Sequence, residues 1–390
     1  MEIPLFQYIA PPLRLFSGPD SLGLLGRELD RLGCRRAVIF CGSSLARDGA
    51  LDPVRAALGE RCAGLFAGVR AHSPVPDVQA GAAELRQRGA DAVIAVGGGS
   101  AIVSARAASI LLAEAGEVRA LATSRDGHGA LRSPRLLAPK LPQLVIPTTP
   151  TTAMVKAGSA IFDPATHERL ALFDPKTRAQ AIFIHPALAA TAPRALVVSA
   201  SLDTLSGALE GLASRGGNPL TDSMLMHALR LLARHLPAQA HGDDPCARGE
   251  LMLAAILCGQ GTEHSGGGIA TVLGHAIGAR HAVENGITKA IVLPHVLRFN
   301  AEAAASGLAK IGAALGLPGT APEPLVARVI ATLEAIFRAL SLPRRLRDVG
   351  VDIAILPDIA EKAMGDWFLR GNPRPVREAV DLEQILKAAW

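Results

Sequence analysis

Short, wholly apolar runs alternate with stretches of helical spacing along the first half of the chain. The runs rich in Val, Ile, Leu, Ala and Phe are expected as strands, at residues 36–41, 62–68, 91–96, 143–146 and 181–184. The segments between them, such as residues 54–58 and 78–87, place apolar side chains on one helical face. Strands that are apolar on both faces, separated by helices, are typical of a parallel sheet covered on both sides. The pattern therefore predicts an α/β domain over residues 1–190.

The pattern changes towards the middle of the chain. Residues 158–163 and 169–174 are expected as the two strands of a hairpin. From about Thr191 onward the strand signals stop, and apolar residues recur at helical spacing. The expected helices cover residues 222–235, 250–258, 301–315 and 324–340. We therefore expect an all-helical domain over residues 191–390.

The composition agrees with two globular domains. A chain of 390 residues exceeds the roughly 250–300 residues at which single cores stop growing. Hydrophobic residues make up 49% and charged residues 19%, which argues against disorder. The formal net charge is only +5, and no basic cluster is interleaved with aromatic residues. Nucleic acid is therefore not an expected partner.

Cysteine usage and the N-terminus indicate the compartment. The five cysteines are scattered and form no CxxC pair, which favours a reducing environment over a disulfide framework. The first residues lack the basic and apolar regions of a signal peptide, and no run of about 18 uncharged apolar residues occurs. We expect a cytoplasmic protein that does not bind a membrane.

A glycine-rich turn follows the expected strand at residues 91–96. It consists of Gly97, Gly98, Gly99 and Ser100, and a helical segment begins directly after it. Glycine lets the backbone approach a ligand closely, and the N–H groups at the start of a helix bind phosphate. The turn is therefore a candidate site for a dinucleotide pyrophosphate. The alternative is a tight turn without a ligand.

A hydroxyl-rich turn follows the expected strand at residues 143–146. It contains Thr148, Thr149, Thr151 and Thr152. Ligands of open parallel sheets bind at the carboxyl ends of the strands, so these hydroxyls could contact nicotinamide, ribose or phosphate. Taken alone, such a run is more often an ordinary loop with capping hydroxyls.

The two turns, in this order, resemble the nucleotide-binding segments of iron-containing alcohol dehydrogenases. Further segments resemble that family in order along nearly the whole chain: residues 201–211 (SLDTLSGALEG), 218–222 (NPLTD) and 272–300, which include His275. Other details resemble maleylacetate reductases most, at residues 68–76, 257–260, 372–376 (NPRPV) and the final LKAAW. The resemblance implies a Rossmann-like nucleotide-binding domain and a helical domain, as in dehydroquinate synthase. It also implies NADPH or NADH as cofactor, a small acid as substrate and a homodimer.

The metal ligands that this resemblance implies are mostly missing. The four positions are Asp203, Gly207, Thr271 and Asn285, where the family has one Asp and three His. Zinc and ferrous iron need three or four strong donors, usually imidazole or carboxylate. We therefore expect no bound metal. Maleylacetate reductases, which are thought to need no metal, resemble the dehydrogenases in keeping these histidines, so the chain departs from them as well.

His275 matches the family histidine that lies beside the nicotinamide and the substrate. Imidazole is suited to general acid catalysis near neutral pH, so His275 is the candidate proton donor or relay. The alternative is a helix histidine held by the core. Asp203 could orient His275 or the substrate, or simply cap or pair locally. His264 and His281 are expected to face solvent, and His185 to be structural.

The cofactor segment also departs from the family pattern. Gly42 stands where NAD-preferring relatives carry an acidic residue that binds the ribose hydroxyls. Without that carboxylate the 2′-phosphate of NADPH is not repelled, and Ser43 and Ser44 could donate hydrogen bonds to it. Val103 and Arg106 replace the Asp and Lys that the dehydrogenases carry after the glycine turn. We expect either NADPH or NADH.

The first interpretation is a metal-independent, NAD(P)H-dependent reductase of an unsaturated or oxo acid similar to maleylacetate. Substrate-binding candidates are Lys156, Thr271, Arg280, His281 and Asn285, which could polarise a carbonyl group, hold a carboxylate or leave space for the substrate. Two alternatives remain. One is a lyase-like enzyme of a biosynthetic pathway on the same fold, and the other is a nucleotide-binding relative without catalysis.

Overall fold

The structure, a computed structural model, describes residues 5–47, 49–127, 131–242, 244–278, 281, 283–319 and 321–390. The chain divides into two units. One unit is formed by residues 11–193, and the other by residues 5–10 together with residues 194–390.

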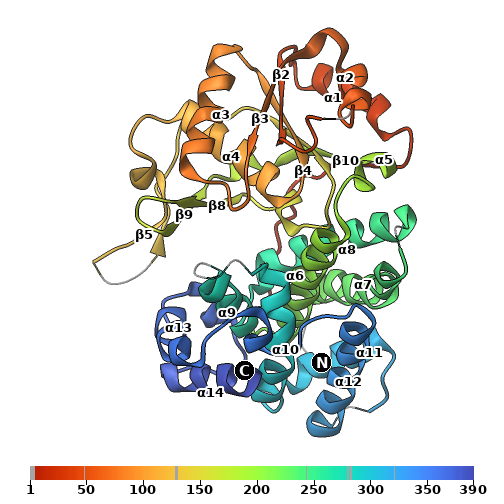
Figure 1. Cartoon of the computed structure of the whole chain (residues 1–390), viewed down its shortest axis with the longest axis vertical. Coiled ribbons are helices and arrows are strands. Elements are labelled where there is room, and N and C mark those ends of the chain that lie inside the picture. Colours follow the sequence, from red (N-terminus) through yellow and green to blue (C-terminus); the bar gives the residue numbers. More distant parts are fainter. Residues whose placement is uncertain are drawn as a thin grey trace. The chain divides into compact units, whose positions relative to one another are not determined.

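A six-stranded parallel sheet forms the centre of the unit at residues 11–193 (Figure 1), with its strands in the order β1-β10-β7-β4-β2-β3. The strands are β1 (Leu15–Ser17), β2 (Ala37–Gly42), β3 (Cys62–Val69), β4 (Ala92–Gly97), β7 (Gln143–Pro147) and β10 (Ala179–Ile184). The central strands β2, β4 and β7 are buried along almost their whole length. The predicted parallel α/β architecture is confirmed, and each predicted strand agrees within two residues at either end. The short edge strand β1, which pairs with β10, was not predicted.

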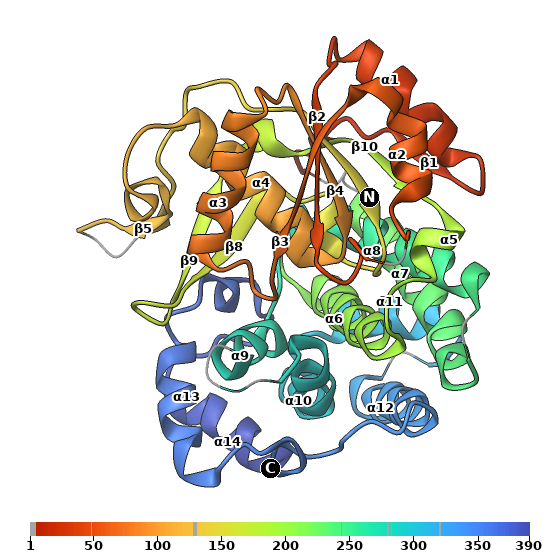
Figure 2. The ribbon, with the colours of Figure 1, turned by 45° about the horizontal axis from the view of Figure 1, so that its top comes forward.

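Helices cover both faces of this sheet (Figure 2). On one face, α1 (Leu25–Arg31) and α2 (Asp52–Leu58) pack their leucines against Ile39 of β2 and Ile94 of β4. On the other face lie α3 (Val75–Gln87) and α4 (Gly99–Ala113). Gly81 makes the close packing of α3 possible, because a Cβ there would lie 2.7 Å from the Phe40 ring. The short helix α5 (Pro186–Ala189) follows β10.

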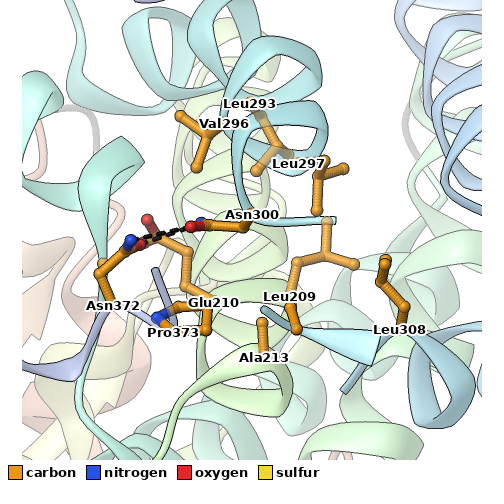
Figure 3. A pocket seen from close by; sticks show the side chains of 12 residues that line it. Leu209, Glu210, Ala213, Leu293, Val296, Leu297, Asn300, Leu308, Asn372 and Pro373 are labelled. Carbon is orange, nitrogen blue, oxygen red and sulfur yellow. Dashed lines mark hydrogen bonds between the residues drawn. The ribbon is translucent and has the colours of Figure 1, made fainter. Parts of the chain in front are cut away.

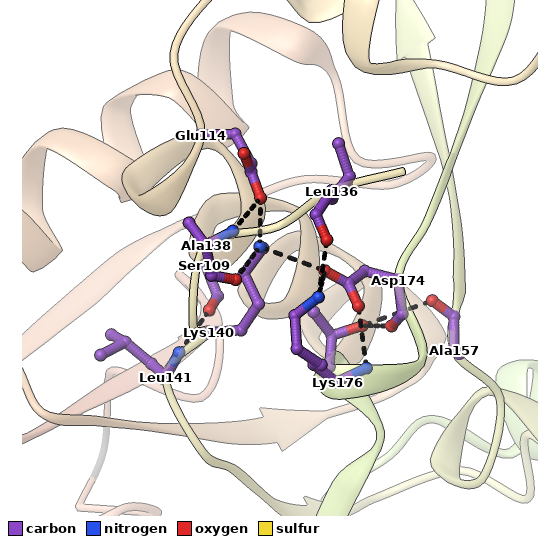
Figure 4. A network of polar contacts seen from close by, with 10 residues as sticks. Ser109, Glu114, Leu136, Ala138, Lys140, Leu141, Ala157, Asp174 and Lys176 are labelled. Carbon is purple, nitrogen blue, oxygen red and sulfur yellow. Dashed lines mark hydrogen bonds and ion pairs between the residues drawn. The ribbon is translucent and has the colours of Figure 1, made fainter. Parts of the chain in front are cut away.

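The predicted hairpin is formed by β8 (Gly158–Asp163) and β9 (Glu168–Phe173), and a smaller one by β5 (Ser124–Arg125) and β6 (Leu131–Arg132). A buried lysine forms ion pairs that connect the end of β9 with the end of α4 (Figure 4). Lys140 Nζ lies 2.6 Å from Glu114 Oε1 and 3.1 Å from Asp174 Oδ2, and its side chain is fully buried. Burial raises the pKa of Asp174, but the hydrogen bonds from Lys176 and Lys140 outweigh it, so the pKa lies below its usual value.

The other unit is built from helices. They are α6 (Arg194–Ala213), α7 (Pro219–His235), α8 (Pro245–Ser265), α9 (Ile269–Gly278), α10 (Asn285–Asn300), α11 (Ala305–Leu315), α12 (Pro322–Ala339), α13 (Leu356–Ala363) and α14 (Ala379–Ala389). No strand occurs after Ile184 in the part of the chain that the structure describes, as the apolar spacing predicts. The Tyr8 ring lies 4.6 Å from the His264 ring, which attaches the N-terminal residues to α8.

Within the described residues, α6 is the one helix long and apolar enough to cross a membrane. Its most apolar stretch is 72% buried inside the structure. Burial of this kind belongs to the central helix of a packed helical unit, and the neighbours α7, α8 and α10 provide it.

A reciprocal amide pair fixes the NPRPV segment near the C-terminus (Figure 3). Asn372 Nδ2 donates to Asn300 Oδ1 at 2.8 Å, and Asn300 Nδ2 donates to Asn372 Oδ1 at 3.0 Å. Both asparagines are buried beside Glu210 of α6, at a cavity of about 10 Å³ that is otherwise lined mainly by leucine and alanine. Unpaired amides would be costly in such surroundings, so the pair explains why this motif needs asparagine.

Candidate active site

The glycine turn lies between β4 and α4. Gly97 has φ +143°, a conformation that other residues rarely adopt, and Gly98 is the N-cap residue of α4. A Cβ at Gly98 would lie 2.9 Å from Thr149 Oγ1, and a Cβ at Gly99 would lie 3.3 Å from Thr151 Oγ1. The two predicted cofactor-binding turns are therefore in direct contact. The first backbone N–H groups of α4 begin there, in the arrangement that binds phosphate in other proteins.

The same edge of the sheet carries the turn after β2. Parallel pairing of β2 with β4, and of β4 with β7, brings their carboxyl ends together. The chain runs from β2 to β3 on one side and then returns to β4 on the other, so the strand order reverses between β2 and β4. Ligands of doubly wound sheets bind at such a reversal. Gly42 and the exposed Ser43 lie at the end of β2, and Gly97 to Ser100 at the end of β4.

The four threonines after β7 differ in their surroundings. Thr148 and Thr149 are buried, and the Thr148 N–H donates to Gly97 O at 3.0 Å. Thr151 caps the short 3₁₀ helix Thr152–Met154, where its Oγ1 accepts a hydrogen bond from the Ala153 N–H. Small glycines and short hydroxyl side chains at a strand reversal fit the requirements of a dinucleotide, whose pyrophosphate needs close backbone approach.

Arg106 of α4 forms hydrogen bonds with backbone carbonyl groups near this edge of the sheet. Its side chain is fully buried, and its guanidinium donates to Gly158 O at 2.6 Å and to Ala153 O at 2.8 Å. It therefore joins α4 to the threonine turn and to the hairpin. Lys156, a predicted substrate-binding residue, lies half-buried just after the threonine turn.

His275 forms a pair with a carboxylate that the sequence did not indicate. His275 Nδ1 lies 2.9 Å from Asp366 Oδ2, with 30% of the histidine and 19% of the aspartate side chain exposed. Asp366 also caps the 3₁₀ helix Trp367–Gly371, because its Oδ1 accepts a hydrogen bond from the Phe368 N–H. The Phe368 ring lies 5.7 Å from the imidazole. The carboxylate is thus held in place, and it holds the ring in turn.

The four implied metal-ligand positions do not form a donor set. Asp203 Oδ1 lies 2.7 Å from Lys289 Nζ, so a side-chain ammonium already contacts this carboxylate. Gly207 offers no donor, and a Cβ there would lie 3.2 Å from Cys258 Sγ. No group of three or more His, Cys, Asp or Glu side chains is placed to hold a metal ion among the described residues. The residues present do not fit the family's metal ion.

Thr271 and Asn285, the other two positions, have structural contacts. Thr271 Oγ1 donates to Glu210 Oε2 at 2.6 Å, and Glu210 also accepts the N–H groups of Ala270 and Thr271 at the start of α9. Burial raises the pKa of Glu210, although the Lys289 charge and these hydrogen bonds act in the opposite direction. A Cβ at Gly278 would collide with Asn285 Oδ1, so the end of α9 and the start of α10 meet there.

The other residues singled out in the sequence are Arg280, His281, His264 and His185. Arg280 lies outside the described residues. His281 is half-buried, and its backbone N–H donates to Ile277 O at 3.0 Å. His264 packs on Tyr8, and its Nε2 lies 3.3 Å from Ile9 O. His185 is the residue that precedes α5.

Comparison with known proteins identifies the family. The model of iron-containing alcohol dehydrogenase matches residues 12–186, and the model of the Fe-containing alcohol dehydrogenase family, C-terminal, matches residues 197–390. The chain is 30% identical over 389 residues to the NADPH-dependent butanol dehydrogenase of Clostridium saccharobutylicum, with 97% of each chain covered.

Solved structures agree with this assignment. The crystal structure of 1,3-propanediol oxidoreductase superposes with a TM-score of 0.90 at 26% identity, covering 99% of this chain and 100% of that chain. The maleylacetate reductase of Agrobacterium tumefaciens gives a TM-score of 0.81 at 24% identity, covering 100% and 99%. It is one of several distant structural neighbours, and its likeness concerns the fold alone. The chain belongs to the iron-containing alcohol dehydrogenase family and is an NAD(P)-dependent oxidoreductase with that family's fold.

Proposed function

We propose that this oxidoreductase reduces an unsaturated or oxo acid similar to maleylacetate, by hydride transfer to its carbonyl group, with NADPH or NADH and without a bound metal ion. We further propose that it acts as a homodimer in the cytoplasm. The observation that carries the proposal is the His275–Asp366 pair, which provides acid catalysis in a chain whose metal-ligand positions hold no adequate donor set. A reductase of this kind needs a hydride donor, a proton donor and a means of polarising the carbonyl.

The dinucleotide is assigned to the edge of the sheet where β2, β4 and β7 end. The backbone of Gly98 and Gly99 would hold the pyrophosphate, and the hydroxyls of Thr149 and Thr151 would hydrogen-bond to the cofactor. Ser43 supplies a hydroxyl near the position of the ribose, with no carboxylate at Gly42 to repel a 2′-phosphate. When bound, the reduced nicotinamide supplies the hydride.

The proton comes from His275 in this proposal. With Nδ1–H donating to Asp366 Oδ2, the opposite ring nitrogen, Nε2, is the one that transfers a proton to a substrate oxygen. The carboxylate fixes the ring orientation, as carboxylates do for catalytic histidines elsewhere. Lys156 and Arg280 are the proposed contacts for a substrate carboxylate.

The test is stoichiometric turnover. The purified protein is mixed with NADPH or NADH and a panel of aldehydes, ketones and oxo acids, and nicotinamide absorbance and product are measured together. The proposal predicts one reduced nicotinamide consumed per carbonyl group reduced, with oxo acids as the best substrates. Product formed without net nicotinamide consumption would indicate a lyase-like enzyme, and binding of the cofactor without any turnover would indicate a non-catalytic relative. Either result would contradict the proposal.

A further inference from the structure

Two helices of the helical unit approach closely enough to bring a lysine onto Asp203. Gly286 at the start of α10 lies directly against the Ser199 carbonyl of α6, and any larger residue there would collide with that backbone. One helical turn further along each helix lie Lys289 and Asp203. Their Nζ and Oδ1 atoms are 2.7 Å apart. The contact therefore follows from helix packing and does not depend on the freedom of a surface side chain.

The course of the lysine side chain is also fixed. A Cβ at Gly274 of α9 would lie 2.9 Å from Lys289 Cγ and 3.1 Å from its Cε, so the methylene chain lies across that glycine. Only 6% of the Lys289 side chain is exposed, whereas 36% of the Asp203 side chain is. The ammonium thus sits at the inner side of a partly accessible carboxylate. The residue that follows Gly274 is His275, the proposed proton donor.

Burying an ammonium is costly unless opposite charge and hydrogen bonds compensate. Asp203 compensates part of the charge directly, and the buried Glu210 acts on it electrostatically from the next turns of α6. An ammonium has three N–H donors, and the Asp203 contact uses one of them. The site therefore holds a cation next to a carboxylate at the position where the family's metal ion would meet its aspartate ligand.

We infer that the Lys289 ammonium takes over the role of the missing metal ion, by donating a hydrogen bond to the substrate carbonyl oxygen beside Asp203. This inference rests on the proposed carbonyl reduction. As the hydride adds to the carbonyl carbon, the C=O π bond breaks and its electron pair moves to the oxygen. Lys289 stabilises that negative charge, and the proton from His275 then converts the alkoxide to the alcohol. The hydride's electron pair would come from the C–H bond that breaks on a bound reduced nicotinamide, so charge and electrons balance.

The test compares Lys289→Met with the wild type under turnover. Loss of one preorganised donor to a developing oxyanion lowers kcat by about 10²–10³-fold. The KM for the reduced nicotinamide should stay near its wild-type value, because Lys289 lies in the helical unit and not at the glycine turn. The kinetic isotope effect with cofactor deuterated at the transferred position should increase, since the chemical step becomes slower. Lys310→Met is the matched control, because Lys310 pairs with Asp222 at 2.8 Å elsewhere in the same unit.

A second variant separates catalysis from folding. Removing one partner of a buried ion pair leaves an uncompensated charge, whereas removing both is often nearly neutral for stability. The double variant Lys289→Met/Asp203→Asn should therefore unfold at a temperature near that of the wild type and remain as slow as Lys289→Met. A double variant with wild-type kcat would overturn the inference, because Lys289 would then be only a counter-ion for Asp203.

The outcomes separate the role of Lys289 from the proposed function. Wild-type turnover together with a folded Lys289→Met variant of unchanged kcat would overturn the role of Lys289 and leave the proposed function intact. A wild type that reduces no carbonyl compound with either cofactor would overturn the proposed function, and the role of Lys289 with it.

Discussion

Replacing Asp366 by asparagine tests the proton-donating pair with little change in shape. In the native protein Asp366 Oδ1 accepts the Phe368 N–H at 3.0 Å, while Oδ2 lies 2.9 Å from His275 Nδ1. Asparagine is as good a helix cap as aspartate, so its single oxygen is expected to keep the Phe368 contact. Its amide nitrogen then faces His275 Nδ1, and a donor opposes the protonated ring. The substitution therefore removes the acceptor that orients His275 for proton transfer in the proposed mechanism.

The magnitude follows from the loss of one charge-assisted hydrogen bond. Such a bond is worth about 1.5–3 kcal/mol, and each 1.4 kcal/mol corresponds to a factor of ten in rate. Because 30% of the His275 side chain and 19% of the Asp366 side chain are exposed, we expect the lower part of that range. The variant should therefore show kcat reduced by about 10- to 50-fold.

The assay is steady-state reduction of the best carbonyl substrate, combined with thermal unfolding. Asp366→Asn should unfold near the wild-type temperature, whereas Asp366→Ala should also lose about 1 kcal/mol of stability with its cap. Asp352→Asn is the matched control, because Asp352 caps the neighbouring 3₁₀ helix Ile353–Ile355 in the same way. An Asp366→Asn variant with wild-type kcat would refute the assignment of His275 as the proton donor.

Three further predictions concern the cofactor turn and the buried lysine network. Gly98→Val places a side chain against Thr149 Oγ1, which lies 2.9 Å from the position of Cβ, and should raise the Kd for NADPH at least tenfold, about 1.4 kcal/mol, in a fluorescence titration. Gly23→Ala is the control, because no atom lies near its Cβ. Unchanged affinity of the Gly98→Val variant would exclude the turn as the binding site. Lys140→Met should lower the free energy of unfolding by about 3 kcal/mol in a urea titration, because it removes one partner of a buried pair; a change within error would mean that the network contributes no stability. The pKa of Asp174 is lowered in the folded protein, so its contribution to stability is present above the unfolded-state pKa of about 4 and is lost as the pH falls through the folded-state pKa. The urea midpoint should therefore fall more on acidification in the wild type than in Asp174→Asn. Parallel curves of midpoint against pH would contradict this.

Local sequence patterns predict the sheet because its strands are buried on both faces. The run 91–96 becomes β4 with every residue of the strand buried, and the glycines after it end the strand at Gly97 and begin α4 at Gly99. β1 escapes prediction because it has only three residues at the edge of the sheet, where pairing with β10 decides its conformation. Apolar periodicity similarly predicts α7 and α12, because each of these helices has one buried face.

The candidate site is only partly predictable for a related reason. The glycine and threonine turns each follow a recognisable strand, so their meeting at one edge of the sheet follows from parallel topology. Asp366 lies 91 positions from His275, and nothing in the spacing of the two residues links them. The sequence around Lys289 predicts only a helix. Lys289 reaches Asp203 because Gly286 lets α10 approach α6 closely. Contacts made by helix packing depend on backbone approach, which apolar periodicity does not encode.

Metal content and turnover measured on the same sample test the central claim most directly. The protein is dialysed against a chelator, its zinc and iron are determined by mass spectrometry, and carbonyl reduction is measured before and after dialysis and after adding either ion back. We predict far less than one metal ion per chain, with a rate that neither chelation nor added metal changes. One tightly held ion per chain, with activity lost on its removal and restored by its return, would contradict a reductase that works through His275, Asp366 and Lys289.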